Sequence, residues 1–333
     1  MKRVVGVVVG ALVALGVVTT PASATVLVSG SLNTVEFVNF ENLFTPTLVE
    51  DGDGGLELIY VRKAEGSLPE IGDVLVGIIN ANNLTVGGIT TSFDDLGFQL
   101  TGIFAQEISA ASFLEDPDLD GAGGDKGTLH LDLTPTTVAT GATLFCNSAA
   151  MTDCFSTSLA AGEEFAFYLQ TGLGTTIFES NGTMLDDVTK ATDGAVFLTL
   201  GPAVTAGDVG PGVVYSHVDF NFLTTQFPVD NFGGLNIITN GTGLSFIGIP
   251  GGIIIVDPDG LLGTNHVLFD PSIVLNPNRL APPLGVSSPW FFRSDDPAYL
   301  LPFNNVIPEV SSLWMLGMGL SGFGIFRRRK WLG

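Results

Sequence analysis

The longest alternating run of the chain is VVYSHVDFNFL, from Val213 to Leu223. Successive side chains of a β-strand point to opposite faces, so Val214, Val218 and Phe222 fall on one face of this run. Shorter apolar or alternating runs recur through the chain, separated by turn residues, and they cover residues 56–62, 74–79, 128–133, 165–169, 195–200, 244–249, 253–256, 267–269 and 272–275. This pattern predicts an all-β domain with antiparallel β-sandwich or jelly-roll-like packing.

Helical patterns are few. Residues 93–108 and 148–164 are the two segments in which we expect a short helix. The proline-rich stretch after Pro271 contains Trp290, Phe291, Phe292 and Tyr299. Because those aromatic residues are too apolar for a free linker, we expect this stretch to pack back on the β-domain.

The composition excludes several classes of protein. The chain carries 34 acidic and 12 basic residues, a net charge of -22, and half of the basic residues lie near its two ends. The central part, residues 25–304, is therefore strongly acidic, which repels phosphate backbones and excludes nucleic acid as a partner. An apolar fraction of 45% excludes a disordered chain, and the length allows one large or two modest β-domains.

The N-terminal residues 1–24 form a predicted signal peptide. Lys2 and Arg3 precede an apolar segment at residues 4–18, and Ala22-Ser23-Ala24 is a small-residue cleavage site. We expect cleavage after Ala24 and export of the rest. The alternative is an uncleaved N-terminal membrane anchor.

The C-terminal residues 305–333 combine an apolar run with a basic cluster. Residues 310–326 contain no charged side chain, and Arg327, Arg328, Arg329 and Lys330 follow at once. A helix of that length spans roughly 26 Å, near the lower limit for crossing a bilayer core of about 30 Å. The basic cluster at residues 327–330 is expected on the cytoplasmic side, which predicts a type I protein with one transmembrane helix. The alternative is a buried helix of a soluble domain.

This tail resembles the PEP-CTERM sorting signal of Gram-negative bacteria, which has a Pro-Glu-Pro motif, one hydrophobic helix and a terminal arginine cluster. The motif here is Pro308-Glu309, with Val310 in place of the second proline and two serines after it. The resemblance implies recognition and processing by an exosortase, a membrane-embedded protease or transpeptidase. It also implies an exported protein, anchored in the inner membrane during sorting and then associated with the cell surface or a biofilm exopolysaccharide matrix.

The two cysteines, Cys146 and Cys154, are eight residues apart. In an oxidising compartment outside the cytoplasm we expect them to form a disulfide. The alternative is a metal-binding pair, for which the neighbouring sequence offers no third or fourth ligand.

One acidic loop resembles the first half of an EF-hand calcium loop. Asp116, Asp118 and Asp120 stand at alternate positions and a glycine follows, but Gly127 stands where the family has a glutamate. Asp125 is the acidic residue expected to complete a calcium site. The alternative is a solvated acidic loop, and the shorter acidic runs at residues 50–55 and 257–260 are weaker candidates of the same kind.

The sequence offers no pattern typical of a catalytic site. The histidines, His130, His217 and His266, lie in or beside predicted strands without an H-E-x-x-H pattern, so we expect ordinary strand histidines rather than a zinc site. A G-x-S-x-G motif is absent, and acidic pairs are expected by chance among so many acids. We therefore predict a structural or adhesive surface protein rather than an enzyme, and no cofactor other than calcium. The alternatives are a calcium- or glycan-binding surface module and, as a third hypothesis, a glycan-active enzyme.

Overall fold

The computed structural model describes residues 27–64, 67, 69–115, 127–136, 143–157, 159–160, 162–171, 182–202, 216–221, 229–250, 263–269, 272–275 and 288–303. The predicted signal peptide and the predicted sorting tail both lie outside these residues. No helix within the described ranges is long and apolar enough to cross a membrane.

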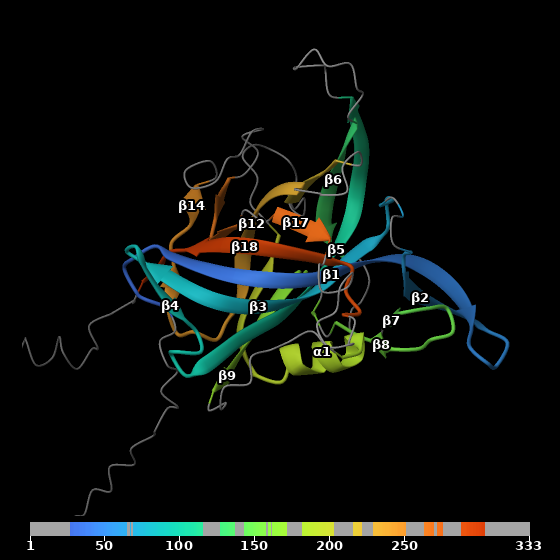
Figure 1. The fold of residues 1–333 in the computed structure, drawn as a ribbon, viewed down its shortest axis with the longest axis horizontal. Coiled ribbons are helices and arrows are strands. Elements are labelled where there is room, and N and C mark those ends of the chain that lie inside the picture. Colours follow the sequence, from blue (N-terminus) through green and yellow to red (C-terminus); the bar gives the residue numbers. More distant parts are fainter. Residues whose placement is uncertain are drawn as a thin grey trace, which may run out of the picture.

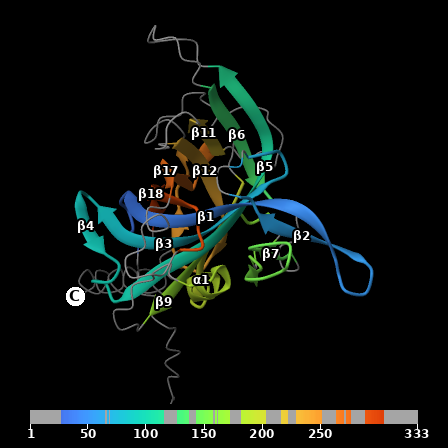
Figure 2. The same cartoon turned by 45° about the vertical axis from the view of Figure 1, so that its right-hand side comes forward.

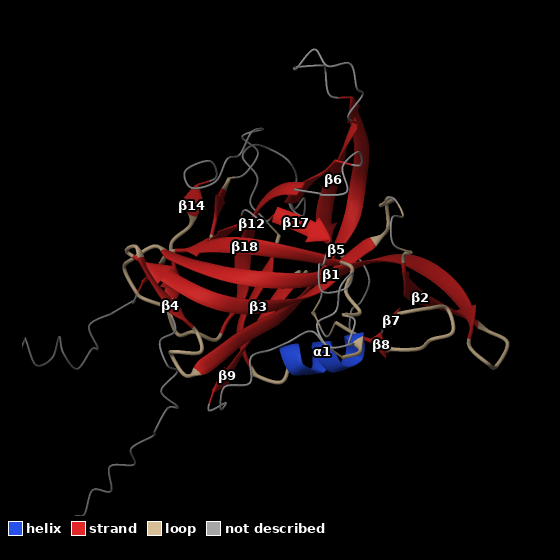
Figure 3. Cartoon of the chain, viewed as in Figure 1, coloured by secondary structure: helices blue, strands red, loops and turns tan. Residues whose placement is uncertain are grey.

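The described chain is mostly β-strand, which confirms the all-β class (Figures 1 and 3). Its strands are β1 (Asn33–Glu50), β2 (Leu56–Arg62), β3 (Val74–Val86), β4 (Ile89–Ser92), β5 (Phe98–Glu115), β6 (Gly127–Pro135), β7 (Phe145–Cys146), β8 (Cys154–Phe155), β9 (Phe165–Thr171), β10 (Ala195–Gly201), β11 (Ser216–Asn221), β12 (Val229–Asn240), β13 (Ser245–Phe246), β14 (Ile249–Pro250), β15 (Thr264–Asn265), β16 (Val267–Phe269), β17 (Ser272–Leu275), β18 (Phe292–Leu300) and β19 (Pro302–Phe303).

The main sheet closes on itself. Antiparallel pairings lead from β1 to β3, β5, β9, β10, β12, β16 and β18, and β18 pairs with β1 again. Strand β5 is connected to β12 by two routes. One runs through β9 and β10, and the other runs through β6 and β11. Figure 1 shows β18, β1 and β3 running together across the molecule, with β12 behind them.

Two strands of 18 residues, β1 and β5, join the parts of this sheet. The first part of β1 pairs with β3 and β18, whereas its last residues pair with β2 in a hairpin that extends from the body (Figure 2). In the same way β5 pairs first with β9 and then with β6. Each long strand therefore contributes both to the closed sheet and to an extension of it.

The observed pairings differ from the two separate, packed sheets that the alternation suggested. In the described residues, fifteen strands belong to one sheet, and two small pairs, β13–β19 and β14–β15, stand beside it. Alternation of apolar and polar residues indicates that a strand has two different faces, but it does not identify the neighbouring strand. The pairing partners are therefore decided by tertiary contacts.

The closed sheet has a core on each side. One hydrophobic cluster, the interior cluster, fills the inside of the closed sheet and includes Phe37 and Leu43 of β1. A second, the outer cluster, lies on the other side of these strands and includes Phe44, with Phe40 packed against it. Strands β3 and β5 divide their side chains between the same two clusters. These strands are buried on both faces, which explains why the predicted strand at residues 74–79 is apolar at nearly every position.

Among the described residues, a helix forms where the sequence did not predict one. The predicted helix at residues 93–108 is wrong, because residues 93–97 form a turn and β5 starts at Phe98. The described residues of the second predicted helix, at 148–164, form turns and β8 instead. The helix of the described part of the chain is α1 (Met184–Ala191), which lies against β3, β5 and β8 on the outside of the sheet (Figures 1 and 2).

The aromatic stretch near the C-terminal end packs on the β-domain, as predicted. Trp290 and Phe291 are buried, and Phe292 begins β18, which lies beside β1. The guanidinium group of Arg62 lies 4.4 Å from the centre of the Phe291 ring. This stretch is therefore part of the fold, and β18 closes the sheet.

Candidate functional site

A buried carboxyl group lies inside the closed sheet. Glu41 of β1 is 2% exposed, and its Oε1 accepts a hydrogen bond of 2.6 Å from Ser294 Oγ of β18. Its other oxygen, Oε2, is buried without a hydrogen-bond partner. Burial raises the pKa of Glu41 to about 7, and hydrogen bonds from Ser294 and Asn39 offset part of that effect.

A second buried carboxyl belongs to Glu164, just before β9. Gln106 Nε2 donates a hydrogen bond of 2.7 Å to Glu164 Oε2, while Glu164 Oε1 is buried without a partner. Backbone hydrogen bonds to Ala105 and Leu200 hold the residue between β5 and β10. Burial raises the pKa of Glu164 to about 8, partly offset by the Gln106 hydrogen bond.

The interior of the closed sheet contains a small cavity beside Glu41. Its volume is about 30 Å³, and its lining comes from all eight strands of the closed ring. Four polar side chains, Asn39, Glu41, Gln106 and Ser294, share the lining with apolar residues. A cavity of this size has room for one or two water molecules. The two carboxyls are thus buried titratable groups, and this cavity offers no space for a sugar ring.

One glycine makes the cavity wall possible. A Cβ atom on Gly77 of β3 would lie 2.5 Å from the Phe104 ring and 2.7 Å from the Phe40 carbonyl oxygen. The missing side chain lets the Phe104 ring lie against β3, where it stacks on Phe165 with 5.1 Å between ring centroids. The aromatic wall of the cavity therefore depends on a glycine inside a strand.

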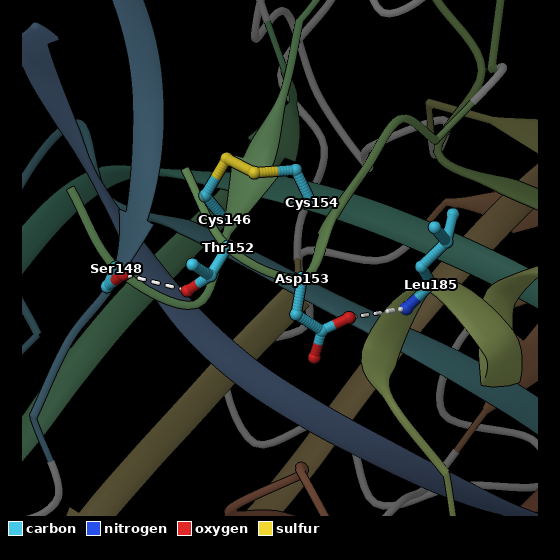
Figure 4. Close-up of a disulfide and its surroundings, with 6 residues drawn as sticks. All are labelled: Cys146, Ser148, Thr152, Asp153, Cys154 and Leu185. Atoms are coloured by element: carbon cyan, nitrogen blue, oxygen red, sulfur yellow. Dashed lines mark hydrogen bonds between the residues drawn. A yellow bond between two sulfur atoms is a disulfide. The ribbon is translucent and has the colours of Figure 1, made fainter. Parts of the chain in front are cut away.

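The cysteines pair on the outside of the closed sheet. The Sγ atoms of Cys146 and Cys154 are 2.08 Å apart and form a disulfide that joins β7 to β8 (Figure 4). Within the loop, Ser148 and Thr152 hydroxyls are 3.0 Å apart. The loop places Asp153 at a positive φ of 51°, in the left-handed region.

Asp153 connects the disulfide loop to the start of α1. Its carboxylate accepts hydrogen bonds from the backbone N–H groups of Met184 (2.9 Å) and Leu185 (3.0 Å), the second of which is drawn in Figure 4. Thr183 caps the same end by accepting from Asp186 N. These contacts satisfy N–H groups that have no partner within the helix, and a negative charge there complements the helix dipole.

Removing the disulfide is expected to loosen this connection. The variant with both Cys146→Ser and Cys154→Ser should lose about 2–3 kcal/mol of unfolding free energy, because a closed loop of this length restricts the unfolded chain. Urea unfolding of wild type and variant measures the loss. Thr152→Ala, which alters the exposed middle of the loop and keeps the disulfide, is the control and should change stability little. Equal stability of wild type and double-serine variant would show that the disulfide does not hold the loop.

The predicted calcium loop and sorting motif lie outside the described residues. Asp116, Asp118, Asp120 and Asp125 belong to the first, and Pro308 and Glu309 to the second. Among the side chains that the structure describes, no three His, Cys, Asp or Glu come together in a group able to hold a metal. Calcium binding by the loop stays a prediction.

The third histidine, His266, is half-buried between β15 and β16. Its Nδ1 accepts a hydrogen bond of 3.3 Å from the backbone N–H of Ile237, and burial lowers its pKa. This environment favours the neutral form of His266, which lies beside a strand.

The sequence reasoning missed the residues that build this site. Glu41 and Glu164 were not distinguished from the other acids, and no helix was predicted over the residues of α1. A signal for α1 was present: Thr183 stands three residues before Asp186, and Lys190 lies in the last turn. For the two glutamates, the local signal is weak, because each has a phenylalanine on one side only.

Comparison of this chain with protein-family models, with curated proteins and with solved structures gives no match in any of the three.

Proposed function

We propose that this chain is an exported structural or adhesive protein of the cell surface or the exopolysaccharide matrix. The observation that carries the proposal is the Cys146–Cys154 disulfide, because disulfides persist in oxidising compartments outside the cytoplasm. The signal-peptide pattern at residues 1–24 and the sorting-signal resemblance at residues 305–333 point to the same route of export.

The interior of the closed sheet supports a structural role. Glu41 lines a cavity of about 30 Å³, and Glu164 is hydrogen-bonded to Gln106 of the same lining. Most of the remaining wall consists of aromatic and aliphatic side chains. Carboxyl groups with raised pKa values are frequent in active sites, but a glycan substrate needs a cleft that admits a sugar ring. We assign these two carboxyls to the packing of the β-domain.

The proposed partners follow from the terminal segments and the charge. An exosortase-type protease recognises Pro308-Glu309, the helix at residues 310–326 holds the protein in the inner membrane during sorting, and the acidic β-domain contacts surface or matrix glycans. The strongly acidic surface also keeps the exported domain soluble and repels nucleic acid.

The native protein's intact mass and cell fraction test this proposal. We expect a species that starts at Thr25 and ends near Glu309, found outside the cytoplasmic membrane. The Pro308→Ala and Glu309→Ala double variant is the matched control, and it should keep its tail and stay in the membrane fraction. A wild-type protein that retains both ends, or one found in the cytoplasm, would overturn the proposal.

A further inference from the structure

Both ends of the described β-domain lie side by side. The backbone N–H of Gly30, three residues after the first described residue, donates a hydrogen bond of 2.8 Å to the carbonyl oxygen of Pro302, which precedes the last one. The two strongly apolar terminal segments, at residues 4–18 and 310–326, are therefore connected to the same end of the domain.

The loop at residues 28–32 is held by one buried side chain. Asn33, the first residue of β1, accepts a hydrogen bond of 2.8 Å from the backbone N–H of Val28. Its Nδ2 donates to the carbonyl oxygens of Val28 (2.8 Å) and Ser31 (2.7 Å). These hydrogen bonds fix the loop in a conformation in which Val28 and Leu32 are exposed to solvent.

The small strand pair β13–β19 adds another apolar residue at this end. Phe246 is paired with Pro302, and the backbone N–H of Ile247 donates a hydrogen bond of 3.0 Å to the carbonyl oxygen of Leu301. The side chain of Ile247 is exposed, and the ring of Phe246 is partly exposed beside it in the sequence.

The turn between β3 and β4 reaches the same end. Val86 is paired with Asn33 at the start of β1 and with Ile89 across the turn, and Ile89 has an exposed fraction of 73%. Figures 1 and 2 both show this turn and the start of β1 at one end of the molecule. We call this surface the apolar end, and its exposed residues are Val28, Leu32, Ile89 and Ile247.

The segments that meet at the apolar end are almost free of charge. In a chain with 34 acidic residues, residues 25–35, 231–256 and 297–308 contain no Asp, Glu, Lys or Arg. Acidic side chains are exposed far from there, for example Asp51 and Asp53 in the turn of the β1–β2 hairpin, at the opposite end in Figure 1. The apolar end can therefore approach anionic lipid headgroups without the repulsion that the hairpin would meet.

The length of chain beyond the domain limits its distance from a membrane. Val310, where the apolar run begins, is seven residues after Phe303, the last described residue. Seven extended residues span at most about 25 Å, and the headgroup layer takes up about 5–8 Å of that distance. If residues 310–326 cross the bilayer, as the proposed function requires, the apolar end must lie close to the membrane surface.

We propose that the apolar end docks on the outer surface of the inner-membrane bilayer while the C-terminal helix anchors the chain. This inference rests on the proposed function. Exposed aliphatic side chains next to partly exposed aromatic rings suit the boundary between headgroups and acyl chains. A few such side chains bind weakly by themselves, but the anchor raises their effective concentration at the bilayer. Docking therefore lasts while the tail is present and ends when it is removed.

Docking also positions the predicted processing motif. Pro308 and Glu309 lie between the last described strand and the apolar run. A domain that rests on the bilayer keeps this motif near the headgroups, which is the depth at which a membrane-embedded protease can reach it.

Single-cysteine labelling of the full chain in liposomes tests the proposal. The two native cysteines form the disulfide, so an introduced cysteine is the one site for a thiol-reactive, polarity-sensitive fluorophore. The chain is reconstituted through its tail into phosphatidylcholine vesicles that contain a lipid with a nitroxide on its headgroup. We expect labels at Leu32→Cys and at Ile247→Cys to emit at shorter wavelength than in water and to be quenched by the nitroxide.

Two further variants serve as controls. Leu56→Cys places the label at an exposed leucine of the hairpin at the opposite end, and this label should show neither the emission shift nor the quenching. In the chain labelled at position 32, the added pair Val28→Asp and Ile247→Asp should reduce the quenching, because burying a charge in the interface is unfavourable. Both aspartates replace exposed side chains, so the fold should be retained.

Three results would overturn the proposal, and they are distinguishable. Labels at positions 32 and 247 that behave like the label at position 56, in a chain that floats with the vesicles, would show that the domain does not dock. An emission shift that grows with the protein-to-lipid ratio and is not quenched would assign the apolar end to a second copy of the chain. A chain that does not float with the vesicles would overturn the membrane anchor of the proposed function, and the docking with it.

Discussion

Trp290→Ala is expected to lower the free energy of unfolding by about 3–5 kcal/mol, the range for truncating a large aromatic side chain in a core. Trp290 is fully buried in the outer cluster, where its ring lies 6.1 Å from that of Phe155. Its Nε1 donates a hydrogen bond of 2.8 Å to the buried carboxylate of Asp187 on α1. The alanine variant would leave a cavity and remove a donor from a buried acid. Urea unfolding followed by circular dichroism measures the effect.

Two further variants divide this loss into its parts. Trp290→Phe keeps an aromatic ring and removes the N–H donor, so it should cost about 1–3 kcal/mol, the range for leaving a buried polar group without its partner. Leu185→Ala truncates an exposed side chain on the same helix and should change stability by less than about 0.5 kcal/mol. An alanine variant at position 290 that is as stable as Leu185→Ala would show that Trp290 does not hold α1 to the sheet.

Glu164→Gln is expected to make the protein more stable at alkaline pH, by about 5 kcal/mol at pH 9, the amount that corresponds to the difference between the two pKa values of Glu164. Burial raises the pKa of Glu164 from 4.5 to about 8, so the folded state binds this proton more tightly than the unfolded state. The stability that the neutral carboxyl contributes is fully present below pH 4.5 and is lost as pH rises through 8. Glutamine keeps the shape and the acceptor for Gln106 but has no proton to lose.

The measurement is the unfolding free energy at pH 5, 7 and 9. Wild type should lose stability steadily over that range, and Glu41 should contribute in the same direction because burial raises its pKa to about 7. Glu164→Gln should remove the share of this loss that Glu164 contributes, which falls between pH 4.5 and 8. Glu163→Gln, at the neighbouring and partly exposed position, is the control and should keep the wild-type slope. A wild-type stability that does not fall between pH 5 and 9 would contradict the burial of a neutral Glu164.

Several strands could be predicted because their sequences have a period of two and end at turn residues. The predicted strands at 56–62, 267–269 and 272–275 coincide with β2, β16 and β17. The predicted helix at 93–108 is wrong although Phe93, Leu96, Leu100 and Phe104 have the three- and four-residue spacing of one helix face. The structure selects the strand, since Leu100 and Phe104 both face the interior when β5 is extended.

The candidate site could not be predicted in the same way. Glu41 and Ser294 are joined by a hydrogen bond between strands that are far apart in the chain, and Gln106 and Glu164 by another. No local sequence pattern predicts a side-chain hydrogen bond between such distant residues.

The sequence by itself determined the all-β class, the residues that tend to form strands, and the packing of the aromatic stretch around Trp290. Those features follow from side-chain alternation, turn chemistry and apolar burial, which act between near neighbours. Only the tertiary structure decided that the sheet closes through β18 and β1, and which acids are buried in the fold. The physical reason is that strand pairing and burial arise from contacts between distant segments, and those contacts exist only in the folded chain.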